Sequence, residues 1–80
     1  MNLYVGNLPF KISEEELKSI FSEYGNLRRA IIVMNNETGR SRGFGFVEFD
    51  NKDDGEKAIS GLNGKEIQGR SIIVNESKKK

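Results

Sequence analysis

Residues 42–49, with the sequence RGFGFVEF, constrain the fold of this chain more than any other stretch. Read as a β-strand, the segment alternates its side chains between two faces of a sheet. One face carries Arg42, Phe44, Phe46 and Glu48, and the other carries Gly43, Gly45, Val47 and Phe49. Both faces are apolar, but only the face with Phe44 and Phe46 has a charged residue at each end. We therefore expect Val47 and Phe49 to belong to the core and the other two phenylalanines to face solvent.

Two neighbouring phenylalanines in solvent need a reason, because each forgoes about 1.5–3 kcal/mol of burial free energy. Flat aromatic rings beside an arginine are suited to stacking on nucleic-acid bases. The opposite assignment, with Phe44 and Phe46 in the core, would turn Arg42 and Glu48 inward, where unpaired charges are costly. The segment thus indicates a strand whose outer face binds nucleic acid.

The composition limits the other classes of function. With 80 residues, of which 35% are apolar, the chain has room for one small core. No apolar run reaches the roughly 20 residues that span a membrane, and no secretory signal segment is evident. Cysteine and histidine are both absent, which excludes disulfides and zinc knuckles and removes the commonest general base. We expect a noncatalytic module without cofactor or metal, in the cytoplasm or, in a eukaryotic source, the nucleus.

Periodicity and turn residues divide the chain into six segments. The expected strands are residues 2–6, 27–34, 42–49 and 71–75, and the expected helices are residues 13–24 and 51–62. The first helix is well specified, because Ser13 and Glu16 fit a capping box and Gly25 is a helix stop. The second helix is weaker, since its two internal glycines each cost about 1 kcal/mol relative to alanine.

The order β-α-β-β-α-β is that of the ferredoxin-like α+β fold. We expect a four-stranded antiparallel sheet with both helices on one face and the other face open. Right-handed crossovers make residues 2–6 and 42–49 central neighbours. Tyr4, on the outward face of the first strand, would then lie beside Phe44 and Phe46. Three aromatic side chains on an uncovered sheet face would form a stacking platform.

The net charge of +1 hides an uneven distribution along the chain. The two expected helices carry seven acidic and three basic residues, a net charge of −4 that leaves +5 for the strands and loops. With both helices in one layer, the strand side would be basic, which suits a nucleic-acid ligand. A surface whose charges are mixed for solubility explains the same composition.

Two segments carry a resemblance to a known family. Residues 42–49 fit every position of the RNP1 pattern, K/R-G-F/Y-G/A-F-V-x-F/Y. Residues 3–8, LYVGNL, are similar to the companion RNP2 hexamer. The chain therefore resembles an RNA recognition motif (RRM) domain over residues 2–76, and within that family the small single-domain bacterial or glycine-rich RNA-binding proteins. We expect the domain over residues 1–77 and a basic tail at 78–80.

The resemblance implies a role for each aromatic residue. Tyr4 and Phe46 match the family positions that stack successive bases, and Phe44 matches the position that packs against sugar rings. Arg42 matches the position that pairs with phosphate. Asn75 and the residues just after it match the place where RRM domains commonly hydrogen-bond base edges.

Other candidates border the expected platform: Asn2, Arg29, Ile31 and Arg40. Asn2 lies on the outward face of the first strand. Arg40 lies in the hairpin loop, where it either grips the RNA backbone or is only solvated. Arg29 and Ile31 share one face of residues 27–34, but the opposite face is equally apolar, so alternation alone does not decide which face is open.

The leading hypothesis is noncatalytic binding of about two to four nucleotides of single-stranded RNA by a monomer, in post-transcriptional regulation or RNA chaperoning. Single-stranded DNA is a second expected ligand, because stacking does not depend on the 2′-hydroxyl. The alternative is a protein-interaction module that uses the acidic helical face. Two roles stay open: Glu48 either accepts a hydrogen bond from a base amino group or repels phosphate, and the tail 78–80 either attracts phosphate or has no role.

Overall fold

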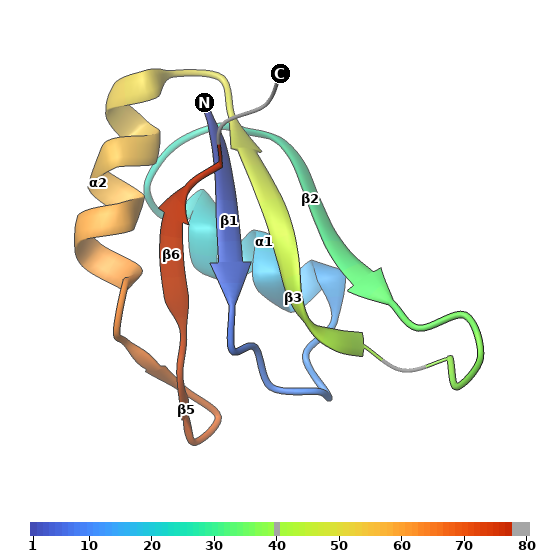
Figure 1. Cartoon of the computed structure of the whole chain (residues 1–80). Helices are drawn as coiled ribbons and strands as arrows, with labels where there is room; N and C mark the ends of the chain where they lie inside the picture. The colour runs from blue at the N-terminus through green and yellow to red at the C-terminus, as the bar shows by residue number, and fades with distance from the viewer. Residues whose placement is uncertain (40, 78–80) are drawn as a thin grey trace.

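The computed structural model describes residues 1–39 and 41–77 and arranges them as a sheet with two helices (Figure 1). The elements are β1 (Asn2–Gly6), α1 (Glu14–Ser22), β2 (Leu27–Met34), β3 (Ser41–Phe49), α2 (Lys52–Leu62), β4 (Glu66–Ile67), β5 (Arg70–Ser71) and β6 (Ile73–Glu76). Four strands form one antiparallel sheet in the order β2-β3-β1-β6. The predicted ferredoxin-like fold is confirmed, with β1 and β3 as central neighbours.

Both helices cover the same face of this sheet. In Figure 1, α1 lies behind the strands, and no helix lies in front of β1 and β3. The face toward the viewer is therefore the open face. None of the helices in the described part of the chain is long and apolar enough to cross a membrane.

The last predicted strand, residues 71–75, has the wrong boundaries. Arg70–Ser71 pairs instead with Glu66–Ile67 in a separate two-stranded hairpin, and the strand of the main sheet is Ile73–Glu76. The cause is the two-residue turn between β4 and β5, where Gln68 and Gly69 have φ angles of 49° and 87°. Two successive positive φ values favour a tight hairpin, and this hairpin takes Ser71 away from the sheet.

The N-terminus of α1 has the predicted capping box. The backbone N–H of Glu16 donates to Ser13 Oγ at 3.1 Å, and the backbone N–H of Ser13 donates to Glu16 Oε1 at 3.0 Å. The helix ends at Ser22, before the predicted residue 24, because the backbone N–H of Tyr24 turns to the carbonyl of Phe21 at 3.0 Å. The box satisfies two backbone N–H groups that the first helical turn leaves without partners.

Replacing Ser13 with alanine should therefore lower the free energy of unfolding by about 1 kcal/mol, within a range of roughly 0.5–2. Urea denaturation followed by circular dichroism measures this change. Ser19→Ala is the matched control, because Ser19 is exposed inside the same helix and alanine is the better helix former there. Equal losses in the two variants would contradict a role for the cap.

The core lies between the covered face of the sheet and the two helices. The strands contribute buried side chains at alternate positions, and the helices contribute one stripe each: Leu3, Val5, Ala30, Ile32, Val47, Phe49 and Val74 from the sheet, and Leu17, Phe21, Ala58 and Leu62 from the helices. Val47 and Phe49 are each only 1% exposed. The predicted assignment of the two faces of β3 is thus confirmed.

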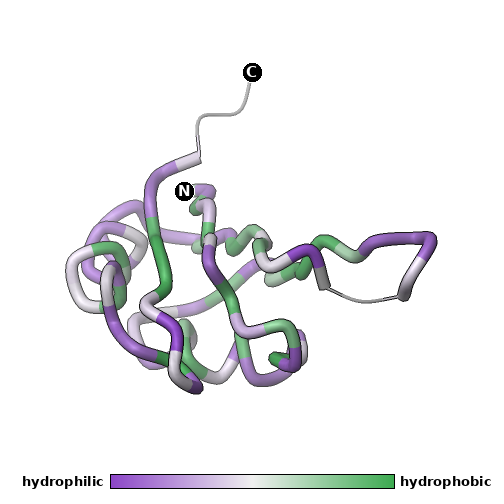
Figure 2. The backbone as a smooth tube through the Cα atoms, turned by 60° about the horizontal axis from the view of Figure 1, so that its bottom comes forward, coloured by the Kyte–Doolittle hydropathy of each residue, from purple (hydrophilic) through white to green (hydrophobic). Residues whose placement is uncertain are grey.

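The β2–β3 hairpin extends beyond the sheet. Figure 2 shows its tip reaching away from the body of the domain as a mostly hydrophilic segment. The Oδ1 atom of Asn35 accepts the backbone N–H groups of Glu37 at 2.8 Å and Thr38 at 3.3 Å, and Gly39 donates to the Asn35 carbonyl at 2.7 Å. These bonds give the described part of the tip a turn of its own.

Candidate nucleic-acid interface

Three aromatic rings lie together at the centre of the open face, and we call Tyr4, Phe44 and Phe46 the aromatic platform. Tyr4 stands directly opposite Phe46 in the pairing of β1 with β3. Ring centroids are 5.9 Å apart for Tyr4 with each phenylalanine and 6.3 Å apart for the two phenylalanines. All three side chains are half-buried, and no helix in the described part of the chain lies in front of the strands that carry them (Figure 1).

The rings of the platform support one another in tilted and edge-on arrangements. The interplanar angles are 33° for Tyr4 with Phe44, 66° for Tyr4 with Phe46 and 90° for the two phenylalanines. Such pairs are favourable beyond the area that they bury. The Tyr4 ring also lies over Gly6, where a Cβ atom would come within 2.7 Å of the tyrosine hydroxyl oxygen. Glycine at position 6 therefore leaves room for the Tyr4 ring.

A row of residues crosses the whole sheet through the platform. Asn75 of β6 pairs with Tyr4, Tyr4 pairs with Phe46, and Phe46 pairs with Ile31 of β2. Asn75 is exposed, and Ile31 is 38% exposed. The structure thus brings two further predicted site residues into line with the rings, one on each side.

The open face of β2 is the one that carries Arg29 and Ile31. On the opposite face Ala30 and Ile32 are each 6% exposed and belong to the core. A register shift lies between Leu27 and Arg29 in the pairing with β3. Burial therefore decides a choice that alternation in the sequence left open.

A second row runs beside the first and borders an open pocket. Asn2 pairs with Glu48, and Glu48 pairs with Arg29. The pocket has a volume of about 260 Å³ and is lined by Asn2, Arg29, Ile31, Phe46, Val47, Glu48 and Ser77. Ser77 was not named individually, but it is one of the residues just after Asn75 that the resemblance implied. Its backbone N–H donates to the Asn2 carbonyl at 2.8 Å, which brings the residue after β6 to the edge of the pocket.

The predicted cationic residues that the structure describes lie at two different places on the sheet. Arg42 is exposed near the start of β3, where the pairing with β2 has a register shift and Gly43 has a φ angle of 86°. Arg29 lines the pocket at the other side of the sheet. Arg40 and the tail 78–80 lie outside the described residues.

The loop after β1 forms a cluster that the sequence did not indicate. Asn7 has a φ angle of 55° and donates from Nδ2 to the Ser71 carbonyl at 2.7 Å. Arg70 donates from Nη2 to Asn7 Oδ1 at 2.7 Å, and its Cζ lies 5.2 Å from the ring centroid of Phe10. Phe10 is 58% exposed. No periodic pattern marks Phe10, because it lies in a loop, and the β4–β5 hairpin brings Arg70 to it.

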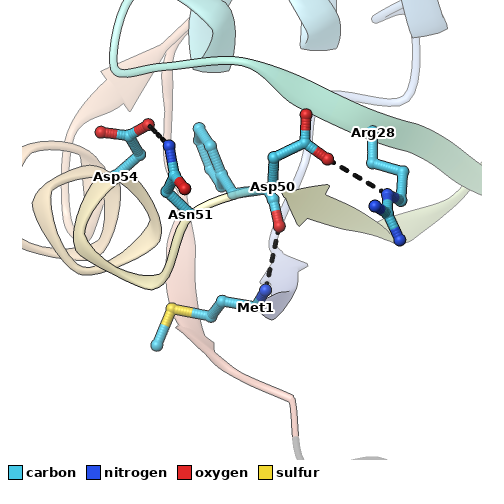
Figure 3. Close-up of polar contacts among 6 residues, drawn as sticks. Met1, Arg28, Asp50, Asn51 and Asp54 are labelled. Atoms are coloured by element: carbon cyan, nitrogen blue, oxygen red, sulfur yellow. Dashed lines mark hydrogen bonds and ion pairs between the residues drawn. The ribbon is translucent and has the colours of Figure 1, made fainter.

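The far end of β3 is held by polar contacts of its own (Figure 3). The N-terminal amino group of Met1 donates to the Phe49 carbonyl at 2.9 Å, and Arg28 forms an ion pair with Asp50 at 3.1 Å. Asn51 donates to Asp54 Oδ2 at 3.4 Å at the start of α2. Arg28 is therefore an exposed cation that already has a partner.

Acidic residues occupy the first turns of both helices. They are Glu14, Glu15 and Glu16 in α1 and Asp53 and Asp54 in α2. Carboxylates at this end favour the helix, because the backbone dipole is positive there. The acidic residues thus lie in the layer behind the sheet, whereas the open face carries Arg29 beside Glu48.

Known proteins resemble this chain in both sequence and fold. A family model described as RNA recognition motif matches residues 3–73. A relative from Nostoc sp., provisionally named RNA-binding protein RbpF, is 42% identical over 80 residues, which are 100% of this chain and 76% of the relative.

Solved structures extend this similarity. RNA Binding Protein PG1 has a TM-score of 0.95 at 45% identity, over 100% of this chain and 96% of that chain. The Sxl-lethal protein in complex with RNA has a TM-score of 0.94 at 30% identity, over 99% of this chain and 47% of that chain. With its matching family model, its RNP1 segment and its sheet, this chain belongs to the RNA recognition motif family.

Proposed function

We propose that this protein binds short single-stranded RNA on the open face of its sheet, without catalysing a reaction. The observation that carries the proposal is the aromatic platform on the one sheet face that no helix covers. Two bases stack on Tyr4 and Phe46, a sugar packs against Phe44, and Arg42 pairs with a phosphate. Stacking suits single strands, because only unpaired bases expose their faces.

The neighbours of the platform support the proposal. Asn75 lies in the same row as Tyr4 and offers an amide that donates and accepts hydrogen bonds to a base edge. Ile31 and Asn2 add contact area on either side of Phe46 and Glu48. A surface of this width holds about two to four nucleotides, since RRM aromatics stack two or three bases.

The names of the similar proteins support an RNA ligand. The Sxl-lethal structure that shares this fold is a complex with RNA, and the Nostoc relative is named for RNA binding. We place the protein in the cytoplasm, as expected for a relative of such bacterial proteins, in post-transcriptional regulation or RNA chaperoning. None of these names points to the alternative of a protein-interaction module.

Replacing Arg42 with glutamine should weaken RNA binding and flatten its salt dependence. One phosphate contact contributes about 0.7 to the slope of log K against log salt for a single strand, so the slope should become less steep by about that amount. Fluorescence anisotropy with a labelled random-sequence RNA octamer, between 50 mM and 200 mM salt, measures the slope.

The matched control is Arg28→Gln. It removes the same charge from an exposed arginine that is paired with Asp50 at the far end of β3. The slope should stay at its wild-type value in this variant. An equal change in both variants would show that only net charge matters, and an unchanged slope in Arg42→Gln would rule out the proposed phosphate contact.

A further inference from the structure

The pocket beside the platform combines apolar walls with a polar rim. Its lining residues are apolar at Ile31, Phe46 and Val47 and polar at Asn2, Arg29, Glu48 and Ser77. The Phe46 ring belongs to both the platform and the pocket. A base that stacks on this ring therefore extends an edge over the polar rim.

Two opposite charges line this pocket and have no hydrogen-bond or ion-pair partner within the described residues. Glu48 and Arg29 are direct neighbours on β3 and β2. Within residues 1–39 and 41–77, neither side chain forms a hydrogen bond or an ion pair; the ion pair found there joins Arg28 and Asp50. Glu48 is half-buried, and a partly desolvated carboxylate without a donor favours a ligand that supplies one.

The two charges match the hydrogen-bonding edge of one base. An ionised carboxylate only accepts hydrogen bonds, and a guanidinium only donates them. Guanine presents two adjacent donors, N1–H and the N2 amino group, followed by the acceptor O6. Adenine and cytosine place a lone-pair nitrogen beside their amino group, and uracil places carbonyl oxygens on both sides of its single N–H. Each of these three bases would turn an acceptor toward the carboxylate.

We propose that this pocket selects guanine in single-stranded RNA. With the base stacked on Phe46, Glu48 accepts hydrogen bonds from N1–H and the N2 amino group, and Arg29 donates to O6. Asn2 and Ser77 complete the polar rim on the side of β1. This inference rests on the proposed function, because it requires RNA on the open face.

The test compares labelled uridine octamers that carry one central guanosine, inosine, adenosine or cytidine, in anisotropy titrations of the full chain. Wild type should bind the guanosine octamer at least about 5-fold more tightly than the adenosine or cytidine octamer, the lower end of what a two-bond base contact contributes. Inosine lacks the N2 amino group, so its octamer should fall in between. Glu48→Gln should remove most of this preference, since glutamine has one acceptor oxygen where glutamate has two.

Glu56→Gln is the matched control, because Glu56 is an exposed carboxylate on α2, behind the sheet, that does not line the pocket. It should leave the guanosine preference unchanged. A Glu48→Gln protein that binds all octamers more tightly by the same factor would show that Glu48 only repels phosphate, and would overturn the proposal. Equal wild-type affinity for the four octamers, with binding still dependent on Phe46, would overturn guanine selection alone. Binding that does not depend on Phe46 would overturn the proposed function together with this inference.

Discussion

Replacing Phe46 with alanine is expected to weaken RNA binding about 5- to 150-fold and to leave the domain folded. A base stacked on an aromatic side chain contributes about 1–3 kcal/mol, which gives this range of affinity. Phe46 is half-buried on the open face and lies at the crossing of the platform and the pocket. Anisotropy titration of a labelled RNA octamer measures the loss, and circular dichroism verifies the fold.

Two further substitutions separate stacking from simple apolar contact. Phe46→Tyr keeps the flat ring and should bind within a small factor of wild type. Phe46→Leu keeps an apolar side chain but not the ring, so it should lose most of what alanine loses. Wild-type affinity in a folded Phe46→Ala protein would eliminate the stacking mechanism, and wild-type affinity in Phe46→Leu would reduce it to apolar contact.

The sequence was sufficient to predict features that depend on one segment or on strong local chemistry. The faces of β3 follow from alternation and from the cost of turning Arg42 and Glu48 inward, and the burial of Val47 and Phe49 confirms them. The capping box at Ser13 depends on two residues three positions apart. To predict that Tyr4 lies beside the two platform phenylalanines, one more rule was needed, the right-handedness of the crossover connections.

Features that depend on the register between distant segments could not be predicted from the sequence. Which face of β2 is open depends on what packs behind it, because both faces are apolar. The pocket needs Asn2, Arg29 and Glu48 in one row and Ser77 beside it, and no local pattern encodes that alignment. The contact of Arg70 with Phe10 depends likewise on where the β4–β5 hairpin folds back.

The charge distribution is a further case in which position matters more than composition. A net charge of +1 does not identify an RNA-binding chain. The structure places acidic first turns behind the sheet, puts Arg29 in the pocket beside the platform and leaves Arg42 exposed near the start of β3. Attraction of phosphate falls off within about 10 Å at 0.1 M salt, so the charges close to the platform decide the interaction more than the total does.

Replacing Phe49 with alanine should strongly lower the stability of the fold and leave the RNA affinity nearly unchanged. The same change at Phe46 should do the reverse. Phe49 is 1% exposed, and its ring centroid lies 6.4 Å from that of Phe21 on α1. Loss of a buried phenylalanine costs about 3–5 kcal/mol, a large part of the roughly 5–15 kcal/mol that holds a small domain folded. Urea denaturation should therefore show a much lower midpoint for Phe49→Ala than for Phe46→Ala.

RNA affinity completes this comparison of two phenylalanines three positions apart on one strand. Measured at low temperature with an osmolyte that keeps Phe49→Ala folded, the affinity should stay close to wild type, because Phe49 points away from the open face. The backbone bonds of Phe49 with Met1, at 2.9 Å in both directions, do not depend on its side chain. A folded Phe49→Ala protein that loses RNA as strongly as Phe46→Ala would contradict the separation of β3 into a core face and a binding face. Similar losses of stability in the two variants would contradict it as well, since the platform ring should contribute far less to the core than the buried one.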